Sequence, residues 1–281
     1  MKKIGAIIQA RVSSTRLPAK ALKKLPFNSD VTVLEQIIRR LKKSVQLNEI
    51  ILATTTEKND SSLVKIAAKE KIGCFRGSKE DVLSRYYLAA KEHNLDVIVR
   101  ITGDCPCIDP EIMDSIIESH IKEKGDYASN TLERGYPHGL DVEVFNSGVL
   151  EKAHNKAKEK FEREHVTPYI YRNAHYKLIK VKAPQHLHAP DIRITLDTEE
   201  DYALLCAVYD YLYDKDESFN TKQIIDLFQQ KPWLRLINKK IRQKIICNSL
   251  EEEMTEAMKV LAQQDLLRVK NLLKSREKHV R

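Results

Sequence analysis

Short apolar runs alternate with longer amphipathic segments through the first half of the chain. The first run, Ile4 to Ile8, stops at a polar and basic loop, which is typical of a buried strand followed by the loop at its carboxyl end. Further apolar runs predict strands at 49–53, 74–76 and 96–102. Apolar residues at helical spacing predict helices at 33–41, 60–72 and 78–93, with another opened by Asp109-Pro110. Strands that alternate with helices predict an α/β fold with a mostly parallel sheet and helices on both faces.

Polar residues beside these segments indicate where several helices begin. Three such pairs are Ser29 with Asp30, Ser78 with Asp81, and Thr198 with Asp201. The last two pairs resemble capping boxes, in which a hydroxyl and a carboxylate satisfy the free N–H groups of a first helical turn.

The alternation loosens after Asp126. The run from Leu140 to Phe145 alternates apolar and polar residues, which predicts a strand with Asp141 and Glu143 on one face. Further strands are expected at 176–183 and 192–196, and helical stretches around Leu150, around His165 and over 198–213.

The last part of the chain has a different character. From Phe219 onward it consists of short helical segments rich in Lys and Arg. One apolar stripe runs through this part, formed by Leu250, Met254, Ala257, Met258 and Leu261. We therefore expect an α/β domain over residues 1–218 and a basic helical C-terminal appendage over residues 219–281, packed on the domain or on a second copy of the chain.

The loop after the first strand carries cations beside hydroxyl groups. The cations are Arg11, Arg16 and Lys20, and the hydroxyls belong to Ser13, Ser14 and Thr15. In open α/β sheets, ligands bind beside the carboxyl ends of strands, and Arg and Lys together suit the oxygens of a polyphosphate. A solvated basic surface loop is the alternative. The loop matches neither the G-x-x-x-x-G-K-[ST] nor the G-x-G-x-x-G phosphate-binding pattern.

Two carboxylates follow other predicted strands. Asp104, in TGDCP, comes directly after the run 96–102, and Asp197, in TLDTEED, lies between the predicted strand 192–196 and a helix start. Carboxylates from two strand ends can hold Mg²⁺ against a triphosphate, because Mg²⁺ prefers oxygen ligands. Each Asp alone is better explained as a helix cap or a loop residue. The combination with the basic loop is what predicts a metal site.

Composition narrows the classes of partner. The chain has 281 residues, of which 42% are hydrophobic and 31% charged, so it can form a sizeable core and should be soluble. Its net charge of +8 fits either a nucleic-acid partner or a small anionic substrate. The basic residues are not interleaved with aromatic ones, which favours the small substrate over nucleic acid.

Neither membrane insertion nor a disulfide framework is expected. No apolar run reaches membrane-spanning length, and Arg11 cuts the first apolar segment too short for a signal peptide, so we expect a cytoplasmic protein with no membrane partner. The five cysteines are an odd number, and Cys105 and Cys107 have no second pair at zinc spacing. Reduced thiols are therefore expected.

Six stretches of the sequence resemble one protein family. They are IIQARVSSTRLPAKAL at 7–22, RGSKEDVLSRYYLAAKE at 76–92, DVIVRITGDCPCIDPEIMD at 96–114, YPHGLDVEVF at 136–145, EREHVTPYIYR at 162–172 and ITLDTEEDY at 194–202. The family is that of the cytidylyltransferases of nucleotide-activated sugar synthesis, in particular the spore coat polysaccharide biosynthesis protein F branch. More distantly, the chain resembles the synthetases of CMP-activated 3-deoxy-manno-octulosonate and CMP-activated sialic acids.

The resemblance implies a fold and a role for each matching residue. The fold is a three-layer α/β/α nucleotidyltransferase fold, similar to nucleotide-diphospho-sugar transferases and Rossmann-like, with a mixed sheet and the catalytic domain at 1–218. The implied nucleotide-binding residues are Gln9, Arg11, Ser14, Arg16, Lys20, Thr54, Gly77, Ser78 and Thr102. Asp104 and Asp197 are the implied Mg²⁺ ligands, and Lys20 and Asp104 the implied catalytic residues. Candidates for a cationic acceptor recess are Arg134, His138, Arg163, His165 and Arg172.

The implied reaction is nucleotidyl transfer. A sugar hydroxyl attacks the α-phosphate of a nucleoside triphosphate, CTP by resemblance, and pyrophosphate leaves. The acceptor would be a small acidic or phosphorylated sugar-type molecule used for cell-surface polysaccharide or glycan synthesis. Two alternatives stay open: a glycosyltransferase that consumes a nucleotide sugar on a related fold, and a non-catalytic pathway partner that kept the fold. The oligomeric state also stays open, with a homodimer as one option.

Overall fold

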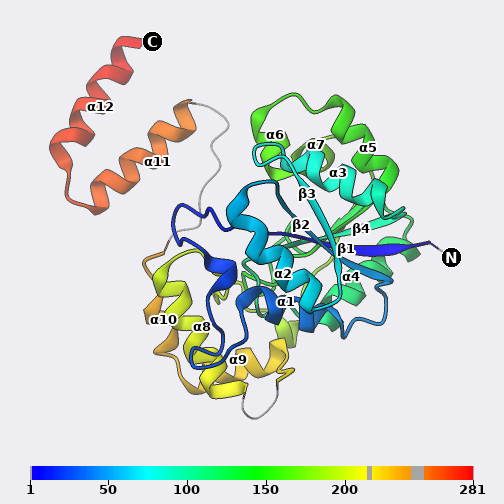
Figure 1. Ribbon diagram of the computed structural model, residues 1–281. Coiled ribbons are helices and arrows are strands. Elements are labelled where there is room, and N and C mark those ends of the chain that lie inside the picture. Colours follow the sequence, from blue (N-terminus) through cyan, green and yellow to red (C-terminus); the bar gives the residue numbers. More distant parts are fainter. Residues whose placement is uncertain (1, 214–216, 242–249, 281) are drawn as a thin grey trace. The chain divides into compact units, whose positions relative to one another are not determined.

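The computed structural model describes residues 2–213, 217–241 and 250–280. The chain forms two compact units, Met1–Lys240 and Ile241–Arg281. The first unit is built on a seven-stranded sheet with the strand order β3-β2-β1-β4-β6-β5-β7 (Figure 1).

Four neighbouring strands of this sheet are parallel. β1 (Ile4–Gln9) lies between β2 (Glu49–Thr55) and β4 (Val97–Thr102), and β3 (Gly73–Gly77) lies outside β2. Ile4 to Ile8 are all buried in β1, which explains why its sequence is a continuous apolar run rather than an alternating one.

The other half of the sheet contains antiparallel pairs. β6 (Glu143–Asn146) is antiparallel to β4, β5 (Tyr127–Ser129) is antiparallel to β6, and β7 (Leu178–Lys180) is parallel to β5. The sheet is therefore mixed, as the resemblance to cytidylyltransferases implied.

Helices cover both faces of the sheet and form two separate hydrophobic clusters with it (Figure 1). On one face lie α1 (Val33–Leu41), α2 (Ser61–Lys69), α4 (Pro110–Lys122), α8 (Glu199–Leu212), α9 (Thr221–Gln230) and α10 (Leu234–Ile237). On the other lie α3 (Val82–Glu92), α5 (Ser147–Lys156) and α7 (Pro168–Tyr171), with α6 (Lys160–His165) against α3 and α7. Short 3-10 turns occupy Lys20–Leu22 (η1), Lys58–Asp60 (η2) and Gln185–Leu187 (η3). This is the expected three-layer α/β/α architecture.

Helix starts agree with the sequence in two places and differ in two. Asp109 caps α4 and Thr198 forms a capping box with Asp201 at the start of α8, as predicted. The box at α1 is Thr32 with Glu35, closer to the helix than the predicted Ser29 and Asp30. At α3 the cap is Asp81 itself, while the Ser78 hydroxyl accepts a hydrogen bond from the Asp81 N–H one turn earlier. In both cases the observed cap lies a few residues closer to the helix than predicted, because a cap must be the residue whose side chain reaches the first free N–H groups.

Two strand predictions need correction. The segment 192–196 is not a strand, because among the described residues its only ladder contact is an isolated bridge between His138 and Arg193. β7 covers only part of the predicted run 176–183, and β5 was not predicted. Both strands have three residues, too few for a hydrophobic period to show in the sequence.

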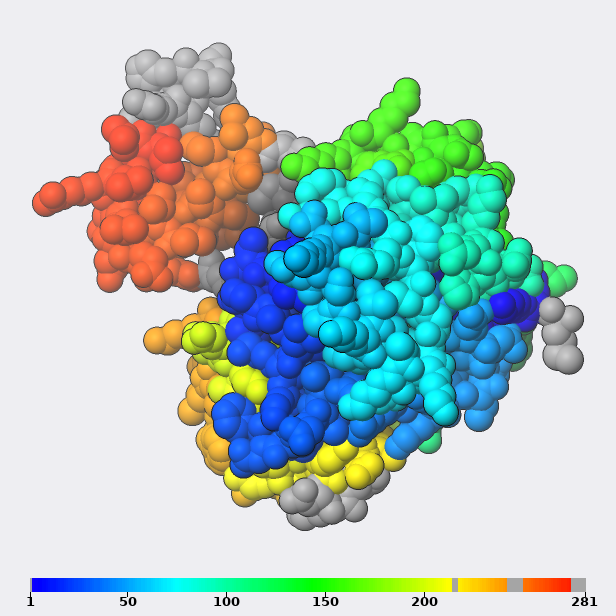
Figure 2. All heavy atoms as spheres, in the orientation of Figure 1, coloured from blue at the N-terminus to red at the C-terminus, as the bar shows by residue number. Residues whose placement is uncertain are grey.

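The predicted domain boundary after residue 218 lies inside the first unit. Phe219 and Phe228 are fully buried in its core, and the buried Arg40 of α1 donates to the Phe219 carbonyl at 2.9 Å. In Figure 2 the yellow residues of α9 pack directly beneath the blue N-terminal segment. The unit therefore continues to Lys240, and α9 and α10 belong to the main core rather than to an appendage.

The second unit contains two helices, α11 (Leu250–Gln263) and α12 (Leu267–Val280), which pack against each other. The predicted apolar stripe lies on α11, where Met254, Met258 and Leu261 are half-buried while Leu250 and Ala257 are exposed. Within the described residues, no helix has the length and apolarity needed to cross a membrane.

Two truncations should separate these units experimentally. A chain that ends at Lys240 is expected to keep a cooperative thermal transition, because it retains α9 and α10. A chain that ends at residue 218 loses the fully buried Phe219, Ile224, Phe228 and Leu234. At about 1.5–3 kcal/mol for each buried side chain, this loss approaches the whole stability of a typical domain. Circular dichroism melting of both chains tests this, and equal transitions would show that α9 and α10 are dispensable.

Candidate functional site

The parallel strands bring their carboxyl ends to one edge of the sheet. The loops after β1 and β4 touch there, since the Gly103 N–H donates to the Gln9 carbonyl at 2.9 Å. A Cβ on Gly103 would lie 2.8 Å from that carbonyl oxygen, so the close approach requires glycine. Asp104, the next residue, is thereby placed beside the basic loop.

Lys20 joins the two carboxylates that the sequence singled out. Its Nζ lies 2.8 Å from Asp104 Oδ2 and 3.0 Å from Asp197 Oδ1. Arg16 Nη2 lies 3.1 Å from the other oxygen of Asp197. Four predicted site residues from distant parts of the chain therefore form one ionic cluster, which we call the Lys20 cluster: Arg16, Lys20, Asp104 and Asp197.

The charges of this cluster stabilise one another. Burial alone would raise the pKa of Asp104, but the Lys20 ammonium and its hydrogen bond lower it to about 2. Burial alone would lower the pKa of Lys20, but Asp104 and Asp197 raise it. Because its folded pKa lies below its ordinary 3.8, the ionised Asp104 contributes stability above about pH 4 that is lost as the pH falls toward 2.

Asp197 reaches the cluster through a non-strand segment that packs on Asp104. The Leu196 N–H donates to the Asp104 carbonyl at 2.8 Å, and the Thr195 hydroxyl donates to the same oxygen at 3.2 Å. The premise that Asp197 ends a strand was wrong, yet its carboxylate shares the Lys20 ammonium with Asp104. Main-chain contacts to Asp104 replace the sheet ladder in holding the two residues together.

A second arginine, which the sequence did not single out, also holds Asp197. Arg193 Nη2 lies 3.3 Å from Asp197 Oδ2 and 2.8 Å from Asp201 Oδ2. Asp201 is fully buried and also closes the capping box of α8. The only local signal was the i,i+4 spacing of Arg193 and Asp197, which is common on any protein surface.

The other predicted nucleotide-binding residues lie along the same strand ends, with different exposure. The Gln9 amide oxygen accepts from Arg100 at 3.1 Å, and Thr102 Oγ1 lies 3.3 Å from the thiol of Cys105. Thr54 is fully buried, and no hydrogen-bond partner for its hydroxyl exists within the described residues. Arg11 and Ser78 are exposed, while Ser14 and Gly77 are half-buried. Of these residues, Arg11 and Ser78 are therefore the most accessible to a ligand, and Thr54 is not accessible.

Two of the five acceptor candidates lie near the Lys20 cluster. Arg134 forms a two-pronged pair with Asp141, at 2.9 and 3.0 Å, and His138 Nδ1 lies 3.1 Å from Arg193 Nη1. Gly139 makes this contact possible: its φ is +115°, and a Cβ there would lie 2.7 Å from the backbone of Ile194. Burial, together with Arg134 and Arg193, lowers the pKa of His138 further than Asp141 raises it.

Of the remaining three candidates, Arg163 and His165 lie on α6, and Arg172 directly follows α7. Arg163 donates through Nε to both oxygens of Asp81, each at 3.1 Å, and through Nη1 to the His154 carbonyl at 2.6 Å. His165 and Arg172 both pack on the ring of Phe161. Arg163 thus joins α6 to the start of α3, and the structure does not bring these three residues together with Arg134 and His138.

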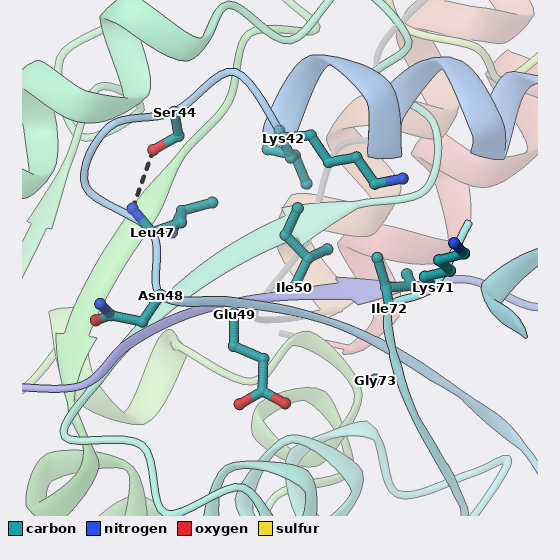
Figure 3. Close-up of a pocket in the computed structure, with 10 residues that line it drawn as sticks. Lys42, Ser44, Leu47, Asn48, Glu49, Ile50, Lys71, Ile72 and Gly73 are labelled. Carbon is teal, nitrogen blue, oxygen red and sulfur yellow. Dashed lines mark hydrogen bonds between the residues drawn. The ribbon is translucent and has the colours of Figure 1, made fainter.

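A separate pocket opens at the opposite, amino-terminal edge of the sheet. It has a volume of about 340 Å³ and lies between the starts of β2 and β3, with Lys42, Glu49 and Lys71 among its lining residues (Figure 3). It shares no residue with the Lys20 cluster. The candidate site is therefore defined by the converging charges at the carboxyl edge, not by this pocket.

Comparison with known proteins shows the family to which this chain belongs. A family model described as cytidylyltransferase matches residues 5–264. The chain is 34% identical to the spore coat polysaccharide biosynthesis protein SpsF of Bacillus subtilis, over 83% of this chain and 96% of that protein. It is 43% identical to the uncharacterized protein MJ1063 of Methanocaldococcus jannaschii, over 87% of this chain and 97% of that protein.

A solved structure agrees with these sequence relatives. A cytidylyltransferase of Leptospira borgpetersenii superimposes with a TM-score of 0.78 at 33% identity, covering 88% of this chain and all of that one. The matched region includes the strands, the basic loop and both carboxylate segments, since the family model runs from residue 5 to residue 264. The chain belongs to the cytidylyltransferase family.

Proposed function

We propose that the protein transfers CMP from CTP to a hydroxyl of a small acidic or phosphorylated sugar-type acceptor, with release of pyrophosphate, for the synthesis of a cell-surface polysaccharide. The observation that carries this proposal is the Lys20 ammonium held between Asp104 and Asp197, beside Arg16 at the carboxyl edge of the sheet. Membership of the cytidylyltransferase family and the name of the Bacillus subtilis relative support the reaction and the pathway.

The donor set fits a divalent cation, Mg²⁺ in this proposal. Two carboxylate oxygens already converge on a single positive group, at 2.8 and 3.0 Å from Lys20 Nζ. No group of three or more His, Cys, Asp or Glu side chains converges anywhere in the part of the chain that the structure describes, so the chain would supply only these two carboxylates to the ion. Asp104 and Asp197 would hold the ion together with phosphate oxygens and water, the arrangement that Mg²⁺ prefers.

The residues of the chain supply binding and charge stabilisation. Arg16 and Lys20 bind the β- and γ-phosphates and stabilise the negative charge that develops on the departing pyrophosphate. Lys20 has to release the two carboxylates to do this, so the positive charge between them must then come from the cation. When bound, a divalent cation polarises the α-phosphate and favours ionisation of the attacking hydroxyl.

The acceptor would lie on the side of Arg134 and His138. Both side chains are held next to the Asp197 segment, His138 by Arg193 and Arg134 by Asp141. An acidic group on the acceptor would compete with Asp141 for the Arg134 guanidinium, because both offer a planar carboxylate to the same fork. Arg163, His165 and Arg172 are weaker candidates for binding the acceptor, because the structure does not bring them together with Arg134 and His138.

A pyrophosphate-release screen tests the proposal. Four nucleoside triphosphates are combined with Mg²⁺ and a panel of acidic and phosphorylated sugars, and we expect pyrophosphate with CTP and at least one acceptor. A glycosyltransferase would instead release a nucleoside diphosphate or monophosphate from a nucleotide sugar. A non-catalytic protein would bind nucleotide and release nothing. Either of these results would replace the proposed reaction.

A further inference from the structure

The conformation of the basic loop depends on one residue, Val12. Its carbonyl accepts hydrogen bonds from the Ser14 N–H at 2.8 Å and from the Ala19 N–H at 3.0 Å. These two bonds close the loop, and Lys20 begins η1 directly after Ala19, whose φ is +54°. The direction of the loop cations therefore depends on where the Val12 peptide is held.

A buried carboxylate from another part of the chain holds that peptide. Asp60 Oδ1 accepts from the Val12 N–H at 2.7 Å. Asp60 Oδ2 accepts from the Thr55 N–H at 3.3 Å and from the Thr55 hydroxyl. Asp60 thus connects the start of the basic loop to the end of β2, where the neighbouring strands also end.

The contacts of Asp60 show that it holds the basic loop and does not cap helix α2, although its position is that of a helix cap. Asp60 is the residue before α2, where an Asp side chain normally caps the helix, but it makes no capping hydrogen bond. Its carboxylate is turned toward the loop instead, and the residue is only 2% exposed. The N-terminus of α2 favours the buried negative charge through the helix dipole.

We propose that Asp60 is a positioning residue for the triphosphate: through Val12 it fixes the loop that carries Arg11, Ser14, Arg16 and Lys20. Asp60 does not touch the reacting atoms in this proposal. It lowers the cost of ordering the loop when the triphosphate binds, because the loop is already held in the binding conformation. The proposal rests on the proposed function for the identity of the ligand.

Asp114 provides a matched control at the opposite edge of the sheet. It is also a poorly exposed carboxylate, at 9%, and it accepts from a loop N–H, that of Val45 at 2.9 Å, and from a hydroxyl, that of Ser44. Ser44 lines the pocket of Figure 3, where its oxygen also accepts from the Leu47 N–H at 3.2 Å. Asp60→Ala and Asp114→Ala therefore remove the same kinds of bond from different loops.

Calorimetric titration with CTP and Mg²⁺, and with tripolyphosphate alone, gives the primary readout. We expect Asp60→Ala to weaken binding of both ligands about tenfold, as for one lost charge-assisted hydrogen bond, and Asp114→Ala to change it less than about twofold. Both variants should lower the thermal midpoint. The triphosphate affinity of Asp60→Asn should lie between those of wild type and Asp60→Ala. Its amide oxygen can still accept from the Val12 N–H, but its amide nitrogen faces the Thr55 N–H and cannot accept from it.

Amide hydrogen exchange without ligand gives a second readout. Asp60→Ala should speed exchange at residues 11–20, and Asp114→Ala only at residues 42–48. Unchanged triphosphate affinity in Asp60→Ala, or equal losses in both Ala variants, would overturn the positioning role while leaving the proposed function standing. A wild-type protein that binds no triphosphate would overturn both.

Discussion

Replacing Asp104 with asparagine is expected to reduce nucleotidyl transfer by about 10²- to 10³-fold or more while leaving the fold intact. The substitution keeps the shape of the side chain but removes the negative charge that faces Lys20 at 2.8 Å. It therefore removes a proposed ligand of the divalent cation, and with it the positive charge that the cation brings to the α-phosphate. Asp197→Asn should be as severe or milder, because water can replace a second ligand.

Steady-state kinetics with the acceptor found by the screen measure this effect. Asp109→Asn is the matched control, since Asp109 is a buried carboxylate close in sequence that caps α4 and accepts from Thr221 at 2.7 and 2.9 Å. It should lower the thermal midpoint without a comparable loss of turnover. Near-normal turnover in Asp104→Asn, or an equal loss in Asp109→Asn, would show that the charge of Asp104 has no special part in the reaction.

Replacing Lys20 with methionine is expected to make the stability of the protein depend on a divalent cation. Methionine keeps much of the side-chain length but removes the charge that holds Asp104 and Asp197 together at 2.8 and 3.0 Å. Without the ammonium the two half-buried carboxylates repel each other, and Arg16 and Arg193 offset this only on the Asp197 side, so the thermal midpoint should fall in chelator and recover on addition of Mg²⁺. Wild type, which carries its own ammonium at this place, should respond less. Turnover should fall as well, because Lys20 is proposed to contact the phosphates.

Lys24→Met provides the comparison for that experiment. Lys24 pairs with Asp30 at 2.8 Å, but the Asp30 side chain is fully exposed, and such a pair contributes little to stability. Loss of the Lys24–Asp30 pair should change neither the thermal midpoint nor the dependence of that midpoint on Mg²⁺. If Lys20→Met behaved like Lys24→Met in both conditions, the two carboxylates would not form a cation site.

The first half of the fold could be predicted from the sequence because its signals are local. The apolar run of β1 is continuous because the strand is buried on both faces, and Asp109-Pro110 marks the start of α4 wherever the helix lies. The meeting of the basic loop with Asp104 followed from the same logic, since the loops after the parallel strands β1 and β4 lie at one edge, whereas Asp197 joins them from a segment that is not a strand. Gly103 then allows the loops after β1 and β4 to touch.

What the sequence did not predict depends on tertiary packing. The apolar residues of α9 have the same helical spacing whether they cover the main core or an appendage, and the many Lys and Arg residues nearby favoured the wrong boundary. Asp60 has the position of a helix cap, and only the fold shows that its carboxylate turns to Val12.

Residue type alone also did not distinguish the acceptor candidates. Arg163 lies inside the matching stretch 162–172 and Arg134 just before the stretch 136–145, and each forms an ion pair with an aspartate. Arg134 is brought toward the Asp197 segment by the turn at Gly139, which packs on Ile194, whereas Arg163 joins α6 to the start of α3. These positions depend on loop packing that no short sequence period encodes.

Anomalous diffraction from crystals grown with Mn²⁺ and CTP tests the central claim, that Asp104 and Asp197 hold one divalent cation against a triphosphate. We expect a manganese peak within about 2.3 Å of an Asp104 oxygen, with Asp197 bound to it directly or through water. The Lys20 ammonium should have moved from the two carboxylates to the phosphates. Bound CTP with Lys20 still bridging Asp104 and Asp197, and manganese absent from that place, would contradict the account.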